Sequence, residues 1–145
     1  MSGVAALQRV AQTLRAEGGL LGGAVIDPPA GTSAPLGDRV TQGPRAAADP
    51  GEYAFVVEAV REGQLIHSGC SRIVSTADTD LALLAGDRLY ALGLSRLAER
   101  GDLEAVAALA HVIARCAHAQ ASGDPALAET AWEEGVARVG WGSGS

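Results

Sequence analysis

The chain has 145 residues, of which 48% are hydrophobic and only 3% aromatic, and its formal net charge is −6. This length indicates one domain, and an apolar mass of Ala, Leu and Val favours packed helices over a β-sandwich, whose strands prefer aromatic and β-branched residues. The sequence contains no Lys, and its scattered Arg residues form no basic patch, so we expect no nucleic-acid partner.

The sequence pattern also argues against a membrane-spanning or secreted protein. No apolar run approaches the roughly 18 residues that a transmembrane helix needs. Polar residues interrupt the N-terminal segment 1–14, which is atypical of a signal peptide. Cys70 and Cys116 are too few for a disulfide framework and fit reduced thiols. We therefore expect a cytoplasmic protein without a transmembrane segment.

The first predicted element is an amphipathic helix over 2–17, within an N-terminal segment 1–19. Val4, Leu7, Val10 and Leu14 recur at helical spacing, and two glycines end the helix at 18–19. The next segment, 20–50, is rich in proline and glycine, which forbids a long helix. We expect a long, largely irregular loop there, with a short strand over 22–27 as one option.

The remaining segment, 51–139, is predicted to be a helical domain, followed by a flexible tail over 140–145. Helices are expected over 51–67, 78–100 and 103–121, and a last one begins at the Asp124–Pro125 cap. The helix over 78–100 is apolar around most of its circumference, which predicts that it is the most buried one. The inward row of the helix over 103–121 is predicted to be Val106, Ala110, Ile113 and Ala117. Together with the first helix, this gives an all-α bundle of about five helices.

Few residues have a spacing that indicates catalysis or metal binding. His111 and His118 lie seven residues apart, about 10 Å along a helix, which is too far for one metal ion. His67 and Cys70 are better explained as a capping histidine and a buried thiol. Asp78 and Asp80 resemble a paired Mg²⁺ site, but acidic residues also belong in the first turn of a helix, and we favour the capping interpretation. No catalytic, cofactor-binding or metal residue is assigned.

Two stretches of the helical domain resemble the trans-isoprenyl (polyprenyl) diphosphate synthases. The run Leu81-Ala-Leu-Leu-Ala-Gly-Asp-Arg-Leu-Tyr-Ala-Leu-Gly-Leu is similar to that family's "LAGD-x-L" helix, and Leu97-Ala-Glu-Arg-Gly-Asp-Leu-Glu follows it in the family's order. Upstream, Leu65-Ile-His67 matches the "LIH" that precedes the family's first aspartate-rich motif. The resemblance covers about 58–123. It implies that the bundle corresponds to part of the isoprenyl synthase fold.

The departures from the family decide the predicted function. Where the family continues into Asp-Asp-x-x-Asp, this chain reads Ser68-Gly-Cys-Ser-Arg72, so the Mg²⁺ ligands that the resemblance would imply are absent. The Gly-Lys-Arg diphosphate-binding segment and a second aspartate-rich motif are missing too. Asp87 matches the family's Gly-Asp, and no catalytic role transfers to it. We therefore expect a non-catalytic synthase-like protein that serves as a dimerisation or regulatory subunit in isoprenoid metabolism.

The predicted partner is a second copy of the chain or a full-length synthase homologue. Small residues on two helices, which would allow a neighbouring helix to approach closely, are the interface candidates: Gly86, Gly93, Ala107, Ala110 and Ala114. A tight core within one chain explains the same residues, and sequence does not separate the two. One alternative is a shortened prenyltransferase that completes a Mg²⁺ site from Asp78 and Asp80 with a partner. Another is a carrier of a small apolar ligand.

Overall fold

The computed structural model describes residues 2–143 and shows an all-α bundle. Within those residues the five longest helices correspond to the five that the sequence predicts. The α-helices are α1 (Gly3–Ala16), α2 (Gly19–Gly23), α3 (Pro35–Val40), α4 (Pro50–His67), α5 (Thr79–Arg100), α6 (Leu103–Ser122) and α7 (Pro125–Trp141), and a 3-10 turn, η1, lies at Pro44–Ala46.

Each long helix begins at a polar cap of the kind that satisfies its free backbone N–H groups. The Ser2 hydroxyl accepts a hydrogen bond from the Ala5 amide at the start of α1. Aspartates perform the same role at the starts of the other four long helices: Asp49, Asp78, Asp102 and Asp124. Because α5 and α6 both end at glycines with left-handed backbone angles, Gly101 and Gly123, the connections after them are short turns.

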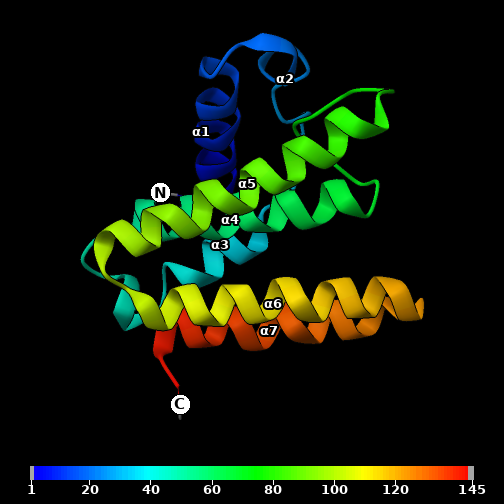
Figure 1. Ribbon diagram of the computed structural model, residues 1–145. Helices are drawn as coiled ribbons and strands as arrows, with labels where there is room; N and C mark the ends of the chain where they lie inside the picture. The colour runs from blue at the N-terminus through cyan, green and yellow to red at the C-terminus, as the bar shows by residue number, and fades with distance from the viewer. Residues whose placement is uncertain (1, 144–145) are drawn as a thin grey trace.

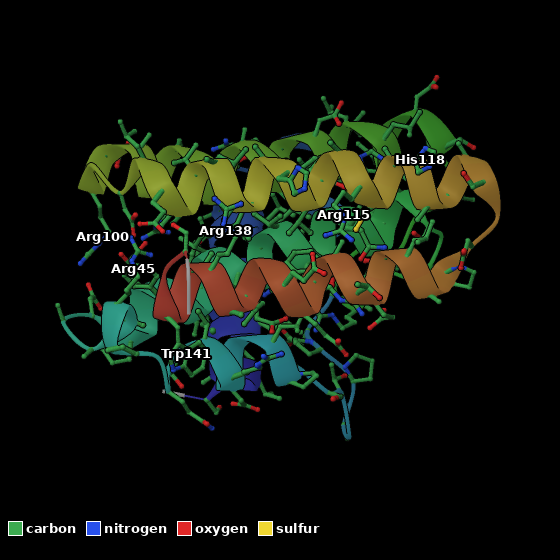
Figure 2. The ribbon with its side chains drawn as sticks, turned by 90° about the horizontal axis from the view of Figure 1, so that it is seen from below. Arg45, Arg100, Arg115, His118, Arg138 and Trp141 are labelled. Atoms are coloured by element: carbon green, nitrogen blue, oxygen red, sulfur yellow. The ribbon has the colours of Figure 1, made fainter. Side chains whose placement is uncertain are left out.

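Helix α4 is the centre of the molecule. In Figure 1, α5 crosses close to α4, α1 stands across the bundle, and α6 and α7 run together along its lower edge. The same pairing of α6 with α7 is seen from below in Figure 2. Of the 18 residues of α4, 12 are buried, compared with 6 of the 22 residues of α5.

The prediction that the helix over 78–100 is the most buried one is therefore wrong. Its apolar stripe is wide because one side packs on α4, whereas another side is open to solvent: Leu83 and Leu84 are 49% and 59% exposed. The sequence of α4 looks less apolar because it contains Glu58 and Glu62. Both are fully buried, because an arginine from outside the helix pairs with them.

Segment 20–50 is more regular than predicted. It contains most of α2, together with α3 and η1, and residues 22–27 form no strand; only an isolated bridge pairs Val25 with Val74. The Gly3 amide donates to Asp38 Oδ1 at 2.6 Å, and the Gly37 amide donates to Glu58 Oε2 at 2.7 Å. These bonds fix α3 against α1 and α4, which is why a segment with many prolines has a defined path.

The C-terminal segment also departs from the predicted tail over 140–145. Helix α7 continues to Trp141, and Gly140 is buried. An added Cβ atom at Gly43 would lie 2.3 Å from the Gly140 carbonyl oxygen, so the two backbones touch. The Ser143 amide donates to Glu104 Oε1 at 2.8 Å. Residues 144 and 145 of the predicted tail, and Met1 of the predicted N-terminal segment, lie outside the described residues.

The turn between α5 and α6 is fixed by Asp102. Its carboxylate caps α6 and also accepts hydrogen bonds from the Tyr53 hydroxyl at 2.5 Å and from Arg45 Nη2 at 2.6 Å. Burial opposes ionisation of Asp102, but these hydrogen bonds together hold its pKa below the ordinary value. A charged, bonded cap therefore ties the start of α6 to α4 and to η1.

Candidate functional site

An open cleft lies between α5 and α6, away from the turn that joins them. Because α5 packs along α4 and α6 packs along α7, α5 and α6 separate toward residues 79–83 and 117–122 (Figure 1). The cleft contains a cavity of about 510 Å³, a volume typical of small-molecule sites. Three helices line it: Gln64 and His67 of α4, Leu83 and Tyr90 of α5, and Ile113, Cys116, Ala117, Gln120 and Ala121 of α6.

Two aromatic rings that line the cleft each lie over a glycine of the neighbouring helix. The Tyr90 ring of α5 covers Gly63 of α4, where an added Cβ atom would stand 2.7 Å from Tyr90 Cδ1. The His67 ring of α4 covers Gly86 of α5, where an added Cβ atom would stand 2.6 Å from His67 Nε2. The ring centroids are 5.3 Å apart. The two glycines therefore allow the helices to approach and fix the inner wall of the cleft.

Gln120 connects α6 to the end of α4 beside this wall. Its Nε2 donates to the His67 carbonyl oxygen at 2.9 Å. A second cavity of about 410 Å³ shares three lining residues with the first, among them Gln120, and is also lined by Asp124 and Glu129. Gln120 thus stands between two adjoining cavities.

The cleft offers hydrogen bonds but no fixed positive charge. Burial raises the pKa of the Tyr90 hydroxyl, and the neighbouring Cys116 and Asp87 raise it further. Burial likewise raises the pKa of the Cys116 thiol. Both groups are therefore neutral at physiological pH. Neither cavity has an arginine in its lining, and the sequence contains no lysine.

The four candidate residues for chemistry fall into two separate groups. Asp78 Oδ1 accepts from the Asp80 amide at 3.0 Å and from the next amide at 3.2 Å, which confirms the capping interpretation of Asp78. Asp80 is exposed in the first turn of α5. Asp87 lies at the edge of the cleft, with Oδ1 3.3 Å from His67 Nε2. Among residues 2–143, no group of three or more His, Cys, Asp or Glu is placed to hold a metal ion.

Segment 68–72, which only the sequence resemblance aligns with an aspartate-rich motif, is tied to two buried carboxylates of α4. The Ser71 hydroxyl and the Arg72 amide donate to Glu62 Oε2 at 2.6 and 2.9 Å. The Arg72 guanidinium lies 2.9 Å from both Glu62 Oε1 and Glu58 Oε1, the second contact being an ion pair without hydrogen-bond geometry. Burial raises the pKa of Glu58, and Arg72 opposes this shift. We call Glu58, Glu62, Ser71 and Arg72 the buried ion cluster.

The predicted interface residues divide into a buried and an exposed set. Gly86 and Gly93 are buried between α4 and α5, and an added Cβ atom at Gly93 would stand 2.6 Å from Val60 Cγ2. These glycines serve a contact within the chain and offer no edge to a second one. Ala107, Ala110 and Ala114 are exposed on α6.

The exposed alanines belong to a longer apolar row on α6, which we call the alanine seam. All of its members are exposed: Leu103, Ala107, Ala110, Ala114, Ala117 and Ala121.

The predicted inward row of this helix is therefore wrong at Ala110 and Ala117 and only partly right at Val106 and Ile113, which are half-buried. The buried face of α6 consists of Ala105, Ala108, Leu109, Val112, Cys116 and Ala119.

Sequence reasoning missed most of the cleft and all of the buried ion cluster. Tyr90 follows Leu83 by seven residues, and Gln120 follows Ile113 by seven, so each pair lies on one side of its helix. That spacing could have identified the side of α5 and the side of α6 that line the cleft. Nothing in the sequence indicated that the walls diverge.

Among the described residues, none of the helices combines the length and the apolar character that crossing a bilayer requires. Comparisons of this chain with protein families, with curated proteins and with solved structures gave no match. The resemblance to the isoprenyl diphosphate synthases therefore rests on the residues quoted for it alone.

Proposed function

We propose that this chain is a non-catalytic isoprenyl diphosphate synthase-like protein, acting as a helical dimerisation or regulatory subunit in isoprenoid metabolism. The kinship derives from the sequence resemblance over 58–123. The assembly derives from one structural observation, the exposed alanine seam. We further propose that the partner is a second copy of this chain.

The alanine seam has the spacing of a coiled-coil contact. Its six residues follow one another at alternating intervals of four and three, the pattern by which a helix presents one side to a neighbouring helix. Small side chains let the two backbones approach closely. Reversing the helix about residue 112 maps the seam onto itself, with Leu103 opposite Ala121, Ala107 opposite Ala117 and Ala110 opposite Ala114. A two-fold dimer with antiparallel α6 helices is therefore self-complementary.

Two polar side chains beside the seam fit the same pairing. Glu104 and His118 lie on one edge of α6, near opposite ends of the helix; His118 is labelled in Figure 2. In the antiparallel arrangement, Glu104 of one copy comes beside His118 of the other, twice per dimer. Such flanking pairs set orientation more than affinity.

The residue types at the position of the aspartate-rich motif support a non-catalytic role. The resemblance implies that family members hold Mg²⁺ on the substrate diphosphate with aspartates at this position. Here Ser71 and Arg72 are bonded to Glu62, and a guanidinium is a poor substitute for a metal-binding carboxylate.

Analytical ultracentrifugation of the purified chain at micromolar concentration tests the assembly. We expect a dimer, and we expect Ala110→Glu to dissociate it, because the change places two carboxylates near the two-fold axis. Ala91→Glu is the matched control: Ala91 is exposed on α5 and lies outside both the seam and the cleft. A wild-type monomer, or a dimer equally sensitive to both changes, would contradict the proposal. A heteromer with a synthase homologue recovered from cells would replace the second copy as partner.

A further inference from the structure

The α5–α6 cleft has the character of a ligand site, and it shares Ala117 and Ala121 with one end of the alanine seam. Its walls are mostly apolar, and its hydrogen-bonding groups lie at the inner wall. Two of these groups are unused: among the described residues no hydrogen bond engages the Tyr90 hydroxyl or the Gln120 Oε1. Tyr90 is partly accessible and lines the cavity, so its hydroxyl is available to a bound molecule.

The charges around the cleft disfavour an anionic ligand. Asp87 lies at its edge, and Asp124 and Glu129 line the adjoining cavity. His67, which lines the cleft, lies with Nε2 3.3 Å from Asp87 Oδ1. No arginine lines the cleft, and the Arg61 guanidinium, which donates to Gln64 Oε1 at 2.8 Å, already pairs with Glu129, so a phosphate group would have to compete with Glu129 for it.

We propose that the α5–α6 cleft binds an uncharged, largely apolar small molecule that carries one hydroxyl or carbonyl group. The apolar part lies against Leu83, Ile113 and Ala117, and the polar group bonds to Tyr90 or Gln120. A hydroxyl satisfies either residue, and a carbonyl accepts from the Tyr90 phenol, which stays protonated. This inference goes beyond the proposed dimer and does not depend on it.

Calorimetric titration of the purified chain with decanol and with decyl phosphate, both below their aggregation limits, tests the charge argument. The two probes share their apolar chain and differ in the head group. We expect decanol to bind and decyl phosphate to bind at least about tenfold more weakly. Equal affinity for the two probes, or no binding of decanol, would overturn the proposal.

Two tryptophan substitutions on α6 locate the site. Ala117→Trp fills the cavity that Ala117 lines, so we expect decanol binding to fall by at least about tenfold. Ala107→Trp is the matched control, because Ala107 is exposed on the same helix and does not line the cavity. The two positions oppose each other in the proposed dimer, so both changes should affect assembly alike. If Ala117→Trp loses decanol binding and Ala107→Trp keeps it, the result supports binding in the cleft whatever the assembly state. If Ala117→Trp still binds decanol, the proposed site is wrong.

Tyr90→Phe examines the head group. It keeps the ring over Gly63 and removes only the hydroxyl, so folding should be preserved. If the hydroxyl bonds the ligand, decanol affinity falls about threefold to tenfold, as one lost hydrogen bond requires. Unchanged affinity in Tyr90→Phe together with unchanged affinity in Gln120→Leu would remove the polar contact on which the proposal depends.

Discussion

Helix α4 borders two regions of the molecule, and the polar groups of the two regions differ in how far the fold itself bonds them. On one side, Glu58 and Glu62 are fully buried and bonded to Arg72, to Ser71 and to the amide of Gly37. On the other side, the α4–α5 wall carries Gln64, His67 and Tyr90 toward a cavity.

This difference separates a structural site from a ligand site. Burying a carboxylate is costly, so the charges of the buried ion cluster are compensated within the fold. Arg72 Nη1 also donates to the Ser33 carbonyl oxygen at 3.0 Å, which ties segment 20–50 to the cluster. In the cleft, the unused bonding capacity of Tyr90 and Gln120 remains available to another molecule. A perturbed pKa alone does not identify a functional site, because a structural ion-pair network such as the buried ion cluster perturbs pKa values too.

The largest expected effect comes from breaking the buried ion cluster. Arg72→Ala leaves Glu58 and Glu62 buried without their cation, so we expect the free energy of unfolding to fall by about 3–5 kcal/mol, measured by urea denaturation. Arg115→Ala is the control, because it removes an ion pair with the largely exposed Glu134 and should cost less than about 1 kcal/mol.

A double variant separates the loss of the Arg72 charge from the loss of packing by its side chain. Adding Glu62→Gln to Arg72→Ala removes one uncompensated charge, and we expect it to restore part of the lost stability. If the double variant recovers no stability, or if Arg72→Ala lowers the free energy of unfolding as little as Arg115→Ala does, the cluster does not hold segment 20–50 in place.

A smaller effect is expected at Gly93, which lies in the close contact between α4 and α5. In Gly93→Leu the new side chain meets Val60 Cγ2 and the carbonyl oxygen of Val56, and the better helix propensity of leucine offsets only about 1 kcal/mol. We expect a net loss of about 2 kcal/mol in thermal or urea unfolding, with the same dimer dissociation constant among folded molecules. Gly23→Leu is the control, since nothing lies within 4 Å of an added Cβ atom there. If Gly93→Leu keeps the wild-type free energy of unfolding but no longer dimerises, Gly93 belongs to the dimer interface instead.

Helical periodicity and capping were sufficient to predict the five long helices and the role of Asp78. The same patterns misplaced the centre of the fold, because they treat a glutamate as exposed. Glu58 and Glu62 violate that rule only because Arg72, from a loop after the helix, reaches back to them. The order of segment 20–50 depends on the same long-range contact, which local composition does not report.

The candidate site was predicted less well than the fold, for a related reason. Gly86 and Gly93 were correctly identified as positions of close approach, but which helix approaches is a tertiary question. Ala110 and Ala117 were predicted to face inward because alanine is compatible with either environment. The cleft arises because α5 packs along α4 whereas α6 packs along α7, and these pairings are long-range contacts that local sequence patterns do not report.

The smallest expected effects concern the start of α5, which borders the open region. Asp78→Ala removes the cap and should lower the free energy of unfolding by about 1 kcal/mol, while Asp80→Ala should cost less than about 1 kcal/mol through the helix dipole. Both losses should be the same with and without Mg²⁺, because the Asp78 side chain is already engaged by the α5 amides.

The shortened prenyltransferase alternative predicts otherwise. It requires Mg²⁺ to stabilise the wild type, Asp80→Ala to abolish that effect, and the purified chain to elongate an allylic diphosphate with isopentenyl diphosphate. Thermal unfolding of the three proteins in EDTA and in Mg²⁺, followed by an elongation assay, separates the two. A Mg²⁺-dependent shift confined to the wild type, accompanied by product, would make the open region a catalytic site completed by a partner.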